Sequence, residues 1–169
     1  MKYIHLSVTK PGKRNLKRVI SWTAVVLYML VIFLFSNQQG AESNRLSGSI
    51  VKEVRSHVNL PAEIKQNDKT YKIDYNRIIR KTTHFFQYFL LALLFYLAFA
   101  SCDLNTKSCI IISFILSVFY AGLDEFHQWF VFERSSRLMD IIIDSSGALL
   151  SLSLVYIRKR SKLDYYKKA

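Results

Sequence analysis

The sequence TTHFFQYFLLALLFYLAFA, from Thr82 to Ala100, contains no Asp, Glu, Lys or Arg. A helix of roughly 20 apolar residues is long enough to cross the hydrocarbon core of a bilayer. Three further long apolar blocks occur, at Val19 to Ser36, Ser108 to about Phe130, and Leu138 to Ile157. Such blocks differ from the short alternating runs of a soluble fold. They predict an all-α integral membrane bundle of four transmembrane helices, in a single domain covering residues 1–169.

The first apolar block follows a basic segment, an arrangement that resembles a signal peptide. The chain offers no clear small-residue cleavage site after Phe35. We therefore expect a retained transmembrane helix and not a cleaved leader.

The charge of the chain is concentrated at its two ends. The formal net charge is +12, and residues 1–18 and 158–169 hold twelve Lys/Arg and one Asp, which leaves little net charge for the rest of the chain. Basic tails beside membrane helices are typical of cytoplasmic anchoring, so no nucleic-acid partner is expected. Two basic tails joined by an even number of spans predict that both termini are cytoplasmic. The polar loop 37–81 is then extracytoplasmic, although it carries nine Lys/Arg against five acids.

Part of the polar loop has helical periodicity. Leu46, Ile50, Val54 and Val58 recur at intervals of four residues, which predicts an amphipathic helix. The pattern leaves open whether this helix lies on the membrane surface or covers the bundle. Residues 62–76 are polar without clear periodicity, so we expect irregular structure there.

Polar and ionisable side chains recur at intervals of three or four residues in three expected spans, so in each helix they share one face. Ionisable groups cost roughly 2.5–3.5 kcal/mol each at the centre of a membrane helix and usually face a bundle interior or a water-filled cavity. In all three helices the charges lie toward the same, extracytoplasmic end. The residues expected to form this polar cluster, or to bind a ligand, are Lys81, His84, Tyr88, Asp124, Glu125, Gln128, Arg134, Asp140 and Asp144.

Two small residues continue the polar face of the last span. Gly147 and Ser151 are four residues apart, a spacing that permits close backbone approach between membrane helices. We expect these residues to pack against a neighbouring helix and not to bind a ligand.

Two segments resemble the VanZ family of bacterial membrane proteins: RKTTHFFQY from Arg80 to Tyr88, and LDEFHQWFVFERSSRLMDIIIDSSG from Leu123 to Gly147. The resemblance implies a multi-pass protein of the bacterial plasma membrane with a role at the cell envelope. The namesake of the family is associated with reduced susceptibility to teicoplanin, a lipoglycopeptide antibiotic. The chain departs from the family pattern at Gln87, where glutamate is common, at Phe132-Glu133, where Pro-Gly is frequent, at Asp144, where asparagine is frequent, and at Ser151, where glycine is frequent.

Three interpretations of the polar cluster follow. It is a structural ion-pair network, or an outward-facing pocket that binds, or limits access of, a lipid-linked or lipoglycopeptide ligand. The third interpretation is an intramembrane enzyme acting on a lipid-linked substrate, or a small proton-coupled transporter, with His84 and Asp124 or Glu125 as the acid–base pair. We favour a non-enzymatic role, because no nucleophile or zinc motif is present and no metal or cofactor is expected. Cys102 and Cys109 likewise predict neither a disulfide nor a metal site.

Overall fold

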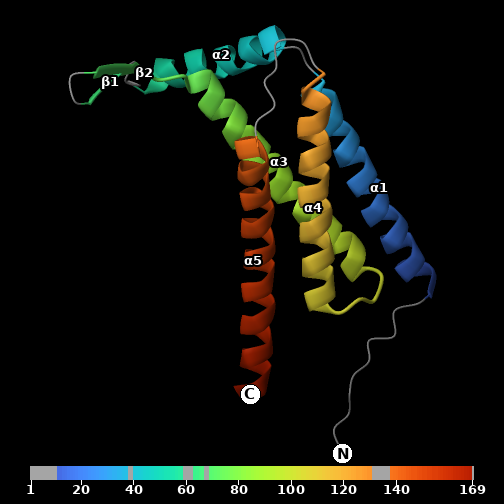
Figure 1. Cartoon of the computed structure of the whole chain (residues 1–169). Coiled ribbons are helices and arrows are strands. Elements are labelled where there is room, and N and C mark those ends of the chain that lie inside the picture. Colours follow the sequence, from blue (N-terminus) through green and yellow to red (C-terminus); the bar gives the residue numbers. More distant parts are fainter. Residues whose placement is uncertain (1–10, 38–39, 59–62, 67–68, 131–137, 169) are drawn as a thin grey trace, which may run out of the picture.

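The structure is a computed structural model that describes residues 11–37, 40–58, 63–66, 69–130 and 138–168 (Figure 1). Four of the helices in these ranges are long and apolar enough to cross a membrane, which confirms the predicted all-α membrane bundle. In chain order the elements are α1 (Pro11–Ser36), α2 (Gly40–His57), β1 (Glu63–Gln66), β2 (Lys69–Lys72), α3 (Tyr75–Ala100), α4 (Thr106–Gln128) and α5 (Leu138–Lys168).

The spanning helices extend beyond the apolar blocks that predicted them. The α3 helix begins at Tyr75, seven residues before Thr82, because the Asp74 side chain accepts a hydrogen bond from the Arg77 amide and caps the first turn. The α1 and α5 helices also continue into the two basic tails. Lys and Arg are good helix formers, so an apolar boundary does not end a helix.

The polar loop contains more regular structure than expected. The predicted amphipathic helix is present as α2. The prediction of irregular structure for residues 62–76 is wrong, because β1 and β2 pair as an antiparallel hairpin with Glu63 opposite Lys72 and Gln66 opposite Lys69. Strands of four residues are too short to produce a recognisable period, and their hydrogen bonds are made with each other and not within one segment.

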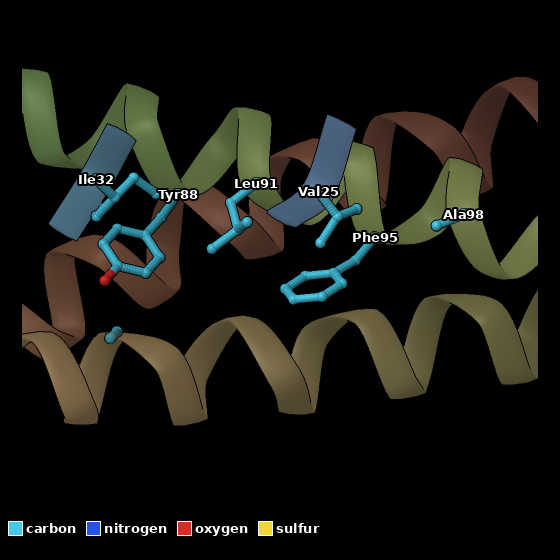
Figure 2. Packing of buried hydrophobic residues seen from close by; sticks show 7 residues of the cluster. Val25, Ile32, Tyr88, Leu91, Phe95 and Ala98 are labelled. Carbon is cyan, nitrogen blue, oxygen red and sulfur yellow. The ribbon is translucent and has the colours of Figure 1, made fainter. Parts of the chain in front are cut away.

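The α3 helix is the centre of the bundle and contacts each of the other helices. One core cluster joins Tyr88, Leu91 and Phe95 of α3 to Val25 and Ile32 of α1 (Figure 2). A second cluster comprises Ala92 and Tyr96 of α3, Cys109 of α4, and Ala148 and Leu152 of α5. Many large apolar side chains of the spans point away from these clusters and are exposed. In a bilayer such side chains face lipid.

The two ends of the bundle differ. The start of α1 and the end of α5 lie at one end, whereas α2 and the hairpin lie across the other (Figure 1). At the terminal end, Arg18 fastens α1 to the turn between α3 and α4, with Nε donating to the Ser101 carbonyl at 2.8 Å and Nη2 lying 2.7 Å from Asp103 Oδ2. The first turns of α3, the last turns of α4 and the first turns of α5 therefore meet at the α2 end.

Candidate ligand-binding site

A small cavity lies where α3, α4 and α5 meet at the α2 end of the bundle. Each helix contributes ionisable side chains, because the chain enters α3 and α5 from this end and leaves α4 there. The cavity is partly open to the outside, and its volume is about 20 Å³. That volume is room for about one water molecule. The lining residues are Arg80, Lys81, His84, Glu125, Gln128, Asp140, Ile143 and Asp144.

Two ion pairs connect α3 to α5 across the cavity. Lys81 Nζ lies 2.7 Å from Asp140 Oδ1, and both side chains are partly exposed. One helical turn deeper, His84 Nδ1 lies 3.5 Å from Asp144 Oδ2. The Asp144 side chain is completely buried, so its charge depends on groups inside the bundle and not on bulk water. The His84–Asp144 contact is an ion pair only when the imidazole is protonated.

The α4 helix supplies the third wall of the cavity. Glu125 and Gln128 both line it, and the Glu125 residue is 2% exposed. Gln128 Nε2 donates a hydrogen bond to Asp124 Oδ2 at 3.1 Å, so Gln128 connects the cavity wall to a second buried carboxylate behind it. Three carboxylates and three basic side chains therefore line the cavity, and the carboxylate of Asp124 lies next to it.

Buried hydroxyl groups continue the polar region into the bundle. The Tyr88 side chain is fully buried, and its hydroxyl points toward α4 (Figure 2). Within the described part of the chain, the side-chain oxygens of Tyr88, Ser113 and Ser151 have no hydrogen-bond partner. Buried polar groups of this kind normally bind ordered water, so we expect internal water molecules between the cavity and the bundle centre.

Close packing of α5 against α3 holds the two ion pairs in place. A Cβ atom on Gly147 would collide with the carbonyl oxygen of Phe85. Glycine at this position lets the α5 backbone touch the α3 backbone. Since Gly147 is three residues after Asp144 and Phe85 follows His84, the same contact brings the imidazole and the carboxylate together. Ser151, two turns farther along α5 than Asp144, is also buried.

Some of the predicted site residues line the cavity and others do not. Six of them, Lys81, His84, Glu125, Gln128, Asp140 and Asp144, line one cavity, whereas Asp124 and Tyr88 are buried but are not among its lining residues. Arg134 lies outside the described residues. His84 Nδ1 lies 3.5 Å from Asp144 Oδ2, whereas the sequence analysis named Asp124 or Glu125 as the carboxylate of an acid–base pair with His84.

Arg80 is a lining residue that the sequence analysis did not assign to the cluster. It precedes His84 by four residues, and this spacing places the two side chains on one face of a helix. The spacing of Arg80 and His84 therefore predicts that Arg80 lies beside the cavity, although the sequence analysis names Arg80 only within the motif that resembles the family. Ile143 is the one apolar residue in the lining, and no polar pattern would have indicated it.

The fold and the cavity define a four-span membrane protein with an ionisable pocket at one end of its bundle. The family profile described as VanZ/LLP1 matches residues 21–159, and the chain belongs to this family. Comparisons with curated proteins and with solved structures gave no significant match.

Proposed function

We propose that this VanZ/LLP1 protein acts at the extracytoplasmic face of the bacterial plasma membrane, where its cavity binds the polar head of a lipid-linked or lipoglycopeptide molecule. One observation carries the proposal: ionisable side chains from three spans converge on a single, partly open cavity. Charges inside membrane helices are expensive and usually mark a ligand or ion site. The cavity-lining turns of α3, α4 and α5 lie at the end of the bundle opposite the start of α1 and the end of α5 (Figure 1), which favours an extracytoplasmic position.

The lining of the cavity suits a ligand head that carries both signs of charge. The Arg80 side chain lines the cavity, where its guanidinium could bind an anionic group such as a phosphate or carboxylate. Asp140 and Asp144 can accept hydrogen bonds from an amine if their present basic partners turn away. The cavity in its present form admits only a small polar group, so binding a head group requires these side chains to rearrange.

An apolar groove offers a place for the lipid part of such a ligand. It has a volume of about 500 Å³ and lies between α4 and α5, lined mainly by apolar residues from Ile110 to Ile115 and from Leu149 to Ile157. Leu149 is five residues beyond Asp144, which corresponds to about 7.5 Å along a helix. At 100° per residue Leu149 also lies about 140° around α5 from Asp144, so an acyl chain whose head is in the cavity would have to pass around α5 to enter the groove.

The first test is binding of teicoplanin to the purified protein in lipid nanodiscs. The affinity of teicoplanin is compared with that of its deacylated glycopeptide core. Loss of the acyl chain should weaken binding if the ligand occupies both the polar cavity and the apolar groove. We expect Glu125→Gln to raise the Kd at least tenfold, which is about 1.4 kcal/mol. Glu53→Gln is the matched control, since it removes the same charge from an exposed position on α2.

Equal affinity of the wild-type protein and the Glu125→Gln variant would contradict the use of this cavity. Failure of the wild-type protein to bind teicoplanin would exclude a lipoglycopeptide as the ligand. The same comparison of wild-type and Glu125→Gln protein with lipid-linked envelope precursors would then test the other proposed ligand class. Both variants must show the melting temperature of the wild-type protein, so that loss of binding is not loss of fold.

A specific observation also supports an acid–base function as the second candidate. His84 and the fully buried Asp144 are 3.5 Å apart, and Glu125 lines the same cavity. A histidine paired with a carboxylate can transfer protons in catalysis or transport. Time-dependent conversion of a lipid-linked substrate, abolished in Asp144→Asn, would favour an enzyme over a binding protein. Proton uptake into vesicles that requires Asp144 would favour a transporter.

A further inference from the structure

The α2 helix and the residue that follows it, Val58, carry a row of apolar side chains that the described part of the bundle leaves exposed. Leu46, Ile50, Val54 and Val58 are between 40% and 54% exposed. They succeed one another at intervals of four residues, so they form one continuous strip, here called the α2 apolar stripe. An exposed apolar strip of this length on a helix of a membrane protein indicates a surface that contacts lipid or another protein.

The contacts between α2 and α3 determine the direction in which the stripe points. Gly48 faces Asn76, whose Oδ1 would lie 3.9 Å from a Cβ at Gly48, and the Arg55 guanidinium lies 5.5 Å from the centre of the Tyr75 ring. At about 100° per residue, Gly48 and Arg55 are on the same side of α2, roughly one third of a turn from the stripe. The first turn of α3 therefore lies against the flank of α2 and leaves the stripe uncovered.

The polar side chains of α2 lie opposite the stripe. Arg45, Ser49 and Lys52 are all exposed, and on the helical wheel they are centred about 130° from Leu46, Ile50 and Val54. A helix with one apolar face and one basic and polar face is typical of a segment that lies in the plane of a membrane interface.

The position of α2 in the fold favours lipid as the occupant. The helix lies across the end of the bundle, beside the start of α3 and beyond the start of α5 and the end of α4 (Figure 1). The exposed apolar side chains of these spans face lipid, and the same bilayer reaches the ends of the spans. An apolar stripe on α2 can therefore meet acyl chains at this end of the bundle, while Arg45 and Lys52 can reach lipid phosphates.

We propose that α2 is an interfacial helix, with the α2 apolar stripe inserted among the acyl chains of the leaflet at that end of the bundle. This inference concerns a lipid-binding surface separate from the cavity. It does not depend on which leaflet this is, nor on the proposed ligand.

The test compares two neighbouring positions that differ in the face they occupy. Single cysteines replace Ile50 in the stripe or Ser49 on the polar face, in a Cys102→Ser, Cys109→Ala background. Each carries an environment-sensitive fluorophore, and the protein is placed in phosphatidylglycerol-containing nanodiscs with nitroxide groups on the lipid acyl chains. We expect blue-shifted emission at position 50 and quenching there at least twofold stronger than at position 49.

Two results would overturn the proposal. Equal quenching at positions 49 and 50 would mean that the stripe does not enter the bilayer. Blue-shifted emission at position 50 without quenching by the lipid nitroxides would mean that protein, such as a second copy of the chain, covers the stripe. A third label at Val54 repeats the comparison one turn farther along, so that a local disturbance at position 50 cannot decide the outcome.

Discussion

The two ion pairs between α3 and α5 have different surroundings, although they are only one turn apart. Lys81 and Asp140 retain partial contact with solvent, whereas Asp144 has none. Removal of one member of a buried pair leaves an uncompensated charge, which destabilises a protein more than removal of both. We therefore expect both pairs to contribute to the contact between α3 and α5.

A double-mutant cycle measures how far the outer pair is structural. We expect Lys81→Met and Asp140→Leu each to lower the free energy of unfolding by about 1–3 kcal/mol, a range below that of fully buried pairs because solvent screens these side chains. The double variant should recover part of the loss, with a coupling of about 1 kcal/mol. Thermal unfolding in detergent, followed by tryptophan fluorescence, provides the measurement. Strictly additive losses would show that the two side chains do not interact.

At the scale of helices, the arrangement of the cavity depends on how closely α5 approaches α3. Interfaces between membrane helices use small residues for this purpose, because apolar side chains gain little from leaving lipid for protein. Gly147 is the position where the two backbones come into contact, beside Phe85. A change of spacing here would move Asp144 relative to His84.

The effect of a single methyl group tests this dependence. We expect Gly147→Ala to destabilise the protein by about 1–3 kcal/mol, since the added Cβ meets backbone atoms that cannot rotate away. Gly122→Ala is the control, because a Cβ at Gly122 meets no atom within 4 Å. It should be neutral or stabilising by up to about 1 kcal/mol through helix propensity. Equal melting temperatures of the two variants would contradict a tight α3–α5 contact.

At the scale of the whole molecule, the two ends of the bundle are chemically distinct. The end that holds the start of α1 and the end of α5 carries the basic segments, and Arg18 fastens α1 to the α3–α4 turn there. The other end holds α2 and the hairpin (Figure 1), and the turns of α3, α4 and α5 that line the cavity are also there. The direction of insertion therefore decides which compartment can deliver a ligand to the cavity.

Labelling of intact cells tests the proposed orientation. Single cysteines replace Ser49 on α2 or Ser161 near the end of α5, both exposed, in the background without Cys102 and Cys109. We expect a membrane-impermeant maleimide to label position 49 from outside the cell, and to label position 161 only after the membrane is permeabilised. The reverse pattern would place the cavity on the cytoplasmic side and overturn the proposed extracytoplasmic ligand.

The sequence by itself determined the number of spans and the face on which each set of polar residues lies. Hydrophobic length is a property of consecutive residues, and the intervals between Lys81, His84 and Tyr88 fix their common face once the segment is helical. The same periodicity identified the amphipathic helix α2.

Only the tertiary structure decided which residues meet. The rotation of each helix about its axis and its displacement along it are set by contacts between helices, such as the one between Gly147 and Phe85. Those contacts pair His84 with Asp144 and bring Arg80 to the cavity. They also leave the α2 apolar stripe uncovered. Patterns within one segment describe that segment alone, so a pairing between two segments requires their relative position in space.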